Sequence, residues 1–162
     1  MNTTSSARSS SASSASARPD HAPAHELAAC VVDAMTDRKA TDITVLDLRS
    51  AGDDEGQTSN VADFFVLATG ASGRQIRAVV NAVKEHVAET LGEHPWRTEG
   101  QEHMQWVVLD YVNVVAHVFS REKREYYDLE RLWGDADTEA VPDDASAAAV
   151  ELLRSEEHAG EY

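Results

Sequence analysis

The pattern of hydrophobic and polar positions changes its period several times along the chain. Leu27, Val31 and Met35 recur every four residues, which predicts a helix, because this spacing places apolar side chains on one helical face. Residues 43–48 alternate between apolar and polar side chains, whereas residues 61–68 are almost continuously apolar. We therefore predict one strand with a single covered face, followed by a central strand that is buried on both faces.

A longer amphipathic helix is predicted after the turn at residues 69–73. Its apolar stripe comprises Ile76, Val79, Val80, Val83, Val87 and Leu91. Ser72 and Gln75 stand three residues apart at its start, which is the spacing of a capping box that satisfies free backbone N–H groups. Gly92 and Pro95 are typical of the end of a helix, so they mark its C-terminus.

The sequence of residues 96–133 predicts three extended segments followed by a final helix. Residues 96–98 are short and extended, residues 106–110 and 114–119 read as a strand pair joined by a turn at 111–113, and residues 121–133 read as a helix. The predicted order of elements is αββαβββα. Helices alternating with strands in this way indicate an α/β domain with a mixed central sheet flanked by helices.

The two ends of the chain differ in composition from this region. Residues 1–20 are rich in Ser and Ala and contain too few apolar side chains to offset the entropy of ordering, which predicts a disordered extension. An organellar transit peptide is the alternative for these residues, because they carry Arg and Ser and almost no acids. Residues 134–162 contain nine acids and one Arg and predict a solvated acidic tail, with a short helix at 145–154 as the alternative. A single domain is thus expected at 21–133, interrupted by a mobile loop at 49–60.

Charge limits the classes of partner. The chain carries 14 Lys and Arg against 29 Asp and Glu, a formal net charge of −15, and binding to nucleic acid requires clustered basic side chains that neutralise phosphates. We therefore expect no sequence-specific nucleic-acid binding and favour a basic protein partner. No apolar run approaches the roughly 20 residues of a membrane span. A lone cysteine in an apolar stretch, Cys30, fits a packing thiol and a reducing compartment, so a cytoplasmic location is expected.

Motifs for catalysis and for cofactor or metal binding do not emerge from the sequence. The turn Gly70-Ala71-Ser72-Gly73 matches neither a nucleotide-binding fingerprint nor a nucleophile elbow, and the seven histidines lack zinc-ligand spacing. One enzymatic alternative is a nucleotidyltransferase-like, Mg²⁺-dependent enzyme, which needs paired acids on the strand soon after such a turn. The acids Asp47, Asp63 and Asp110 instead stand singly on separate predicted strands. We therefore predict a binding protein without catalytic residues, cofactor or metal, and keep the enzyme as the alternative.

The segment from Trp106 to Trp133 is unusually rich in aromatic side chains. It contains two of the three Trp and three of the four Tyr of the chain, and aromatic and Arg residues are typical of binding hot spots. Adjacent Tyr126 and Tyr127 point about 100° apart on a helix, so at least one ring should lie at the surface.

Six clusters in this order resemble the ribosomal silencing factor family, RsfS, also called Iojap. They are residues 62–67, 70–72, 74–75, 106–111, 117–119 and 124–133, and the resemblance covers roughly residues 26–133. The chain departs from the family pattern at Gln105, where the family usually has Gly, and at Val112-Asn113, where it has a Gly-Asp turn. Because Val is poorly suited to a positive φ, we expect the turn to be longer or of another type.

The resemblance implies a nucleotidyltransferase-like α/β fold without the catalytic acids of the transferases. It also implies a protein that binds the large ribosomal subunit through ribosomal protein fourteen, blocks joining of the small subunit and so represses translation, with a role in large-subunit assembly in some relatives. A homodimer of the free protein is compatible with the resemblance. Carried over residue by residue, Trp106 and Tyr111 would be apolar anchors and Asp110 would pair with a basic residue of the partner. The full set of implied contact residues is Trp106, Leu109, Asp110, Tyr111, His117, Arg124 and Tyr127.

Overall fold

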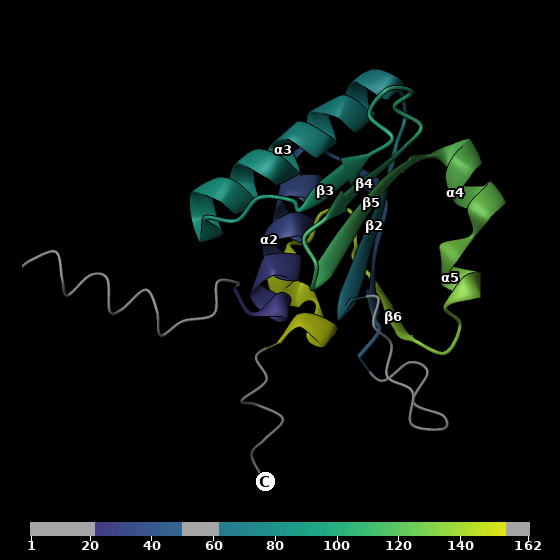
Figure 1. Ribbon diagram of the computed structural model, residues 1–162. Coiled ribbons are helices and arrows are strands. Elements are labelled where there is room, and N and C mark those ends of the chain that lie inside the picture. Colours follow the sequence, from purple (N-terminus) through teal and green to yellow (C-terminus); the bar gives the residue numbers. More distant parts are fainter. Residues whose placement is uncertain (1–21, 50–61, 155–162) are drawn as a thin grey trace, which may run out of the picture.

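A computed structural model describes residues 22–49 and 62–154 (Figure 1). The predicted disordered extension, nearly all of the predicted mobile loop and the last eight residues lie outside these ranges. The elements run in the order α2 Ala24–Asp37, β1 Thr41–Asp47, β2 Phe64–Gly70, α3 Gly73–Leu91, β3 Arg97–Glu99, β4 Trp106–Asp110, β5 Val114–Ser120, α4 Arg121–Tyr127, α5 Leu129–Leu132 and β6 Asp137–Ala140. The predicted α/β class and the mixed sheet are confirmed.

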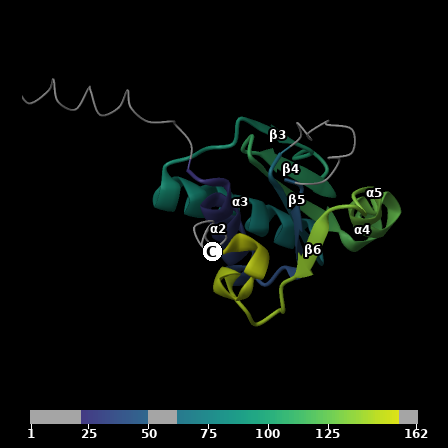
Figure 2. The same cartoon turned by 90° about the horizontal axis from the view of Figure 1, so that it is seen from below.

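Six strands form one sheet in the order β3-β4-β5-β2-β1-β6. β2 and β5 pair in parallel, and the other neighbouring strands pair antiparallel. α2 and α3 lie against one face of this sheet, and α4 and α5 lie against the other (Figures 1 and 2). All seven residues of β2 are buried, because this strand has neighbours on both edges and side chains packed on both faces.

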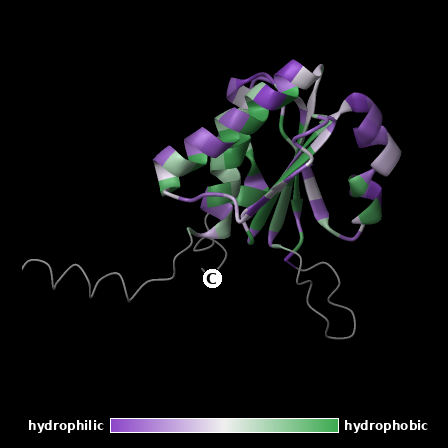
Figure 3. Cartoon of the chain, turned by 45° about the horizontal axis from the view of Figure 1, so that its top comes forward, coloured by the Kyte–Doolittle hydropathy of each residue, from purple (hydrophilic) through white to green (hydrophobic). Residues whose placement is uncertain are grey.

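The main core lies between the sheet and the pair α2 and α3. Leu27, Val31 and Met35 from α2 meet Val79 and Val83 from α3, and all five are buried. Figure 3 shows hydrophobic colour on the strands and on the sides of these helices that face them. The predicted amphipathic stripes are therefore confirmed.

The start of α3 has the predicted cap. Ser72 Oγ accepts a hydrogen bond from the Gln75 backbone N–H at 3.1 Å. The Gln75 side chain reaches back to the backbone N–H of Ala71 rather than to that of Ser72, so the reciprocal half of the capping box is displaced by one residue.

The prediction of a solvated tail from residue 134 onward is wrong for the described residues up to 154. β6 pairs antiparallel with β1 and forms one edge of the sheet. Beyond β6, Val141, Val150 and Leu153 are buried in the main core, and the backbone N–H of Ala147 donates to Asp33 on α2. The alternative of a short helix at 145–154 is closer to the structure, which forms two 3₁₀ helices there, Ala147–Ala149 and Glu151–Leu153.

The predicted helix at 121–133 is also corrected. Asp128 has φ 46° and separates α4 from α5. Asp tolerates this left-handed conformation better than most residues, because its short polar side chain bonds locally. The chain therefore turns back toward the sheet after Tyr127 and does not continue as one straight helix.

The hairpin between β4 and β5 has the unusual turn that the sequence suggested. The Tyr111 N–H donates to Val114 O at 2.9 Å, and the Asn113 N–H donates to Tyr111 O at 3.0 Å. The second of these bonds closes a three-residue γ-turn around Val112, whose φ is 80°. The turn is thus of another type, and Val112 takes the positive φ that we expected it to avoid.

Candidate docking site on the second face of the sheet

A smaller apolar cluster covers the sheet face opposite α2 and α3. Its buried members are Leu46, Leu48, Phe65, Leu67, Val115, Phe119, Leu129 and Ala136. Trp106, Val108 and Trp133 pack against this cluster while staying partly exposed. Side chains alternate along β4, so Trp106, Val108 and Asp110 share this face while Val107 and Leu109 point into the main core.

Aromatic rings connect the buried cluster to the surface. The Trp106 ring centroid lies 5.0 Å from that of Phe119 and 4.6 Å from that of Tyr127. Tyr126 stands perpendicular to Tyr127 at a centroid distance of 4.9 Å. Tyr126 is 77% exposed and Tyr127 is 43% exposed, which confirms that at least one of the adjacent rings lies at the surface.

His117 lies beneath Trp106 and is buried. The indole N–H of Trp106 donates to His117 Nδ1 at 3.1 Å, and the Phe65 ring packs edge-on at 4.7 Å. Burial first, and then the positive charge of Arg124, lower the pKa of His117 to about 3. A neutral imidazole that accepts from Trp106 supports the Trp106 ring from below, so the predicted contact role of His117 is corrected to a packing role.

The predicted contact role of Leu109 and Tyr111 is also corrected, since both side chains lie in the main core. Their exposed fractions are 0% and 2%. Burial raises the pKa of Tyr111 well above its ordinary value, so its hydroxyl stays neutral. Neither residue is accessible to a partner in this conformation.

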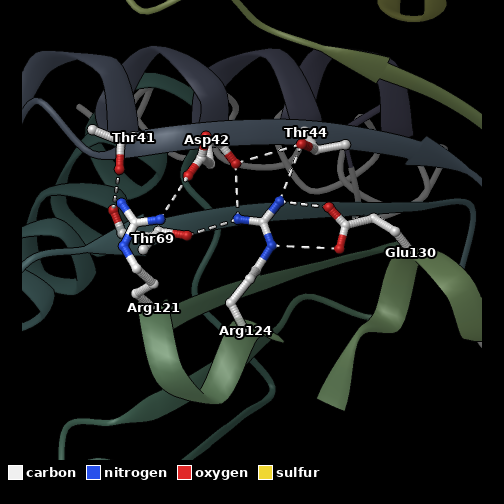
Figure 4. A network of polar contacts seen from close by, with 7 residues as sticks. All are labelled: Thr41, Asp42, Thr44, Thr69, Arg121, Arg124 and Glu130. Carbon is white, nitrogen blue, oxygen red and sulfur yellow. Dashed lines mark hydrogen bonds and ion pairs between the residues drawn. The ribbon is translucent and has the colours of Figure 1, made fainter. Parts of the chain in front are cut away.

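Arg124 is an internal connector between α4 and the sheet (Figure 4). Its side chain is 11% exposed, and its guanidinium donates to Asp42 O at 2.8 Å and to Thr69 Oγ at 2.9 Å. Further bonds reach Thr44 Oγ at 3.1 Å and the Glu130 carboxylate at 2.6 Å. Because these bonds occupy its donors, Arg124 is not a free contact for a partner.

A family model described as "Ribosomal silencing factor during starvation" matches residues 20–161 of the chain. The chain belongs to this ribosomal silencing factor family. The resemblance identified from the sequence is therefore confirmed, and the match includes the C-terminal segment that the resemblance left out.

Individual RsfS relatives agree with the family match. Ribosomal silencing factor RsfS of Halalkalibacterium halodurans is 39% identical over 113 residues, which cover 70% of this chain and 90% of the relative. The RsfS of Bacillus subtilis is 38% identical, and the match covers 64% of this chain and 80% of that protein. A mouse protein named "Mitochondrial assembly of ribosomal large subunit protein 1" is 34% identical over 73 residues, which cover 44% of this chain and 32% of the mouse protein.

A solved structure from Chromobacterium violaceum has the same fold. It is 30% identical in sequence, superposes with a TM-score of 0.62, and the match covers 79% of this chain and 98% of that one. The family is named for silencing of ribosomes, a regulatory role, and the chain is accordingly a ribosome-associated factor. Among the described helices, none is long and apolar enough to cross a membrane.

Of the contact residues that the RsfS resemblance implied, the structure leaves Trp106, Asp110 and Tyr127 partly open to solvent. Sequence reasoning missed Val108, although its place two residues from both Trp106 and Asp110 on a strand puts it on the same face. We use the term docking face for Trp106, Val108 and Asp110 of β4 together with Tyr127 of α4.

A separate hollow of about 560 Å³ lies between α4, β1 and the segment that follows β6. Its polar lining includes Asp42, Arg121, Glu125 and Asp143. Within residues 22–49 and 62–154, no group of three or more His, Cys, Asp or Glu side chains is arranged to hold a metal ion. Asp47 and Asp110, two of the acids weighed for the enzymatic alternative, bond to the Arg49 guanidinium and to the Val112 N–H respectively.

Proposed function

We propose that this RsfS-family protein binds the large ribosomal subunit through the basic ribosomal protein fourteen and thereby keeps the small subunit from joining. The observation that carries the proposal is the docking face, where the Trp106 and Tyr127 rings pack at 4.6 Å and Asp110 lies on the same face at the other end of β4. Half-buried aromatic rings on a rigid sheet are typical anchors for a protein partner. The mouse relative, whose name refers to the large ribosomal subunit, supports that subunit as the partner.

Charge supports a protein contact over an RNA contact. A chain with a net charge of −15 is repelled by ribosomal RNA and attracted to a basic protein patch exposed between RNA segments. The carboxylate of Asp110 would pair with a Lys or Arg of the partner. Binding should therefore weaken as salt is added, because screening shortens the reach of these charges, and naked ribosomal RNA should not compete.

Co-sedimentation of the purified protein with isolated large subunits tests the proposal. Trp106→Ala should weaken binding by about thirtyfold, since truncating a central aromatic anchor costs about 2 kcal/mol or more. Trp96→Ala is the matched control, because Trp96 is 68% exposed and lies outside the second-face cluster. Equal binding by both variants and the wild type would place the contact elsewhere.

The charge of Asp110 can be tested without disturbing the hairpin. Its Oδ1 accepts from the Val112 N–H at 2.8 Å, and Asp110→Asn keeps this acceptor while removing the charge. Binding to large subunits should fall, and the salt dependence should become shallower. An unchanged salt dependence would show that this carboxylate does not meet a basic residue.

Subunit joining is the functional readout. Excess wild-type protein added to mixed subunits in cytoplasm-like salt should reduce the fraction of subunits that sediments as complete ribosomes. The Trp106→Ala variant, added at the same concentration, should leave this fraction nearly unchanged. A role in large-subunit assembly would use the same docking face, as the name of the mouse relative suggests. That role would appear as precursor large subunits accumulating in cells that lack the protein.

A further inference from the structure

The guanidinium of Arg124 joins α4 to three other segments of the chain. Its bonds reach Asp42 and Thr44 of β1, Thr69 of β2 and Glu130 of α5, at distances from 2.6 to 3.4 Å (Figure 4). The two Glu130 bonds form a bidentate pair with Nε and Nη2. With these five bonds every N–H donor of the side chain is used, which is the full capacity of an arginine.

Two residues with positive φ create this geometry. β1 has an irregular register between Thr41 and Thr44, and Asp42 within it has φ 50°, so its carbonyl oxygen turns toward Arg124. Asp128 has φ 46° and ends α4. In an unbroken helix, residues 124 and 130 would lie about 9 Å apart along the axis and about 120° apart around it, so their side chains would not face each other. The break at Asp128 is therefore what brings Glu130 to Arg124.

α4 depends on this connection because it places no buried side chain in the core. None of its seven residues, all of them described, is buried. Helices this short are unstable alone and need tertiary contacts. Tyr127 stands three residues after Arg124 on the same helix, so the two side chains are neighbours on its surface. The position of Arg124 thus sets where the Tyr127 ring meets Trp106.

We propose that Arg124 is a positioning residue for the docking face: it clamps α4 to the ends of β1 and β2 and thereby holds Tyr127 against Trp106. This inference rests on the proposed function for its effect on ribosome binding. The part of the inference that concerns the orientation of the Tyr127 ring can be tested on the free protein, without any partner.

The decisive variant is Arg124→Lys, which keeps the positive charge but offers one ammonium in place of a planar five-donor group. Arg121→Lys is the matched control, because Arg121 lies on the same helix, is 67% exposed and pairs with Asp42 at a long distance of 3.9 Å. Two quantities are measured on the full chain. The first is the affinity for isolated large subunits. The second is the NMR chemical shifts of the Tyr127 ring protons, which are sensitive to the Trp106 ring because the two ring centroids lie 4.6 Å apart.

Arg124→Lys should move the Tyr127 ring shifts toward their values in an unstructured peptide and weaken binding by about tenfold, because the ring must then be ordered on binding. Arg121→Lys should change neither. Unchanged ring shifts in Arg124→Lys would overturn the inference. A loss of affinity with unchanged ring shifts would also overturn it, since it would make Arg124 a direct contact. If the wild type fails to bind large subunits, the proposed function fails, yet the ring shifts still test the clamp.

A milder variant covers the case in which Arg124→Lys does not fold. Glu130→Gln keeps a hydrogen-bond acceptor for the guanidinium but removes the charge that strengthens the bond. It should shift the Tyr127 ring signals in the same direction and weaken binding by about threefold. Ring signals and affinity equal to the wild type would refute the clamp.

Discussion

Lowering the pH should destabilise this protein through His117. The imidazole is buried among Phe65, Trp106 and Phe119, and its pKa in the folded state is lowered to about 3. In the unfolded chain a histidine has a pKa of about 6.5. Between these two values the unfolded state binds a proton that the folded state does not, so the free energy of unfolding falls as the pH falls through this window.

The size of the effect follows from the two pKa values. From pH 7 to pH 5 the loss attributable to His117 is about 2 kcal/mol, since each pH unit well inside the window contributes about 1.4 kcal/mol. Protonation at Nδ1 would also break the bond from the Trp106 indole. The docking face should therefore loosen along with the fold as the solution is acidified.

Urea unfolding at pH 7, 6 and 5 measures this dependence. His117→Asn is the comparison variant, because Asn keeps an acceptor near the position of Nδ1 and does not titrate. It should be less stable at pH 7, because the ring packing is lost. Between pH 7 and pH 5, however, its free energy of unfolding should fall by about 2 kcal/mol less than that of the wild type. Parallel curves for the two proteins would refute the assignment of His117 as a neutral buried group.

Three further sites test the local geometry by urea unfolding. Val112→Gly should raise the free energy of unfolding by about 1 kcal/mol, because relief of a strained positive φ outweighs the added chain entropy; a less stable variant would argue against the γ-turn. Asp128→Gly should change stability by at most about 0.5 kcal/mol, because glycine takes a positive φ without steric cost. Asp128→Val should lose about 1–2 kcal/mol, and equal stabilities of the two Asp128 variants would contradict a left-handed residue here. Leu153→Ala should cost about 2–5 kcal/mol as a buried core deletion. Its control is Leu132, which is 71% exposed. Leu132→Ala should cost at most about 0.5 kcal/mol, and similar losses at both leucines would show that the C-terminal segment does not pack on the core.

Much of the sheet and both long helices could be read from the sequence alone. The stripe on α3 is a local pattern with the period of a helix, and the apolar run of β2 has the length and the flanking turn residues of a buried strand. The family could also be identified from clusters such as residues 106–111 and 124–133. These features depend on residues close together in the chain, so no tertiary contact is needed to infer them.

The tertiary structure alone decided which residues of the aromatic stretch are accessible and what holds them. Leu109 and Tyr111 alternate with Val108 and Asp110 on or beside β4, and the sequence does not say which set faces the helices. Arg124 looked like a contact residue, because its acceptors on β1 and β2 lie more than 50 positions away in the chain. The same holds for the segment after Trp133, because its few apolar residues are buried only where α2 and β1 provide a surface for them. Burial and long-range hydrogen bonding depend on contacts between distant segments, and such contacts leave no local pattern in a single sequence.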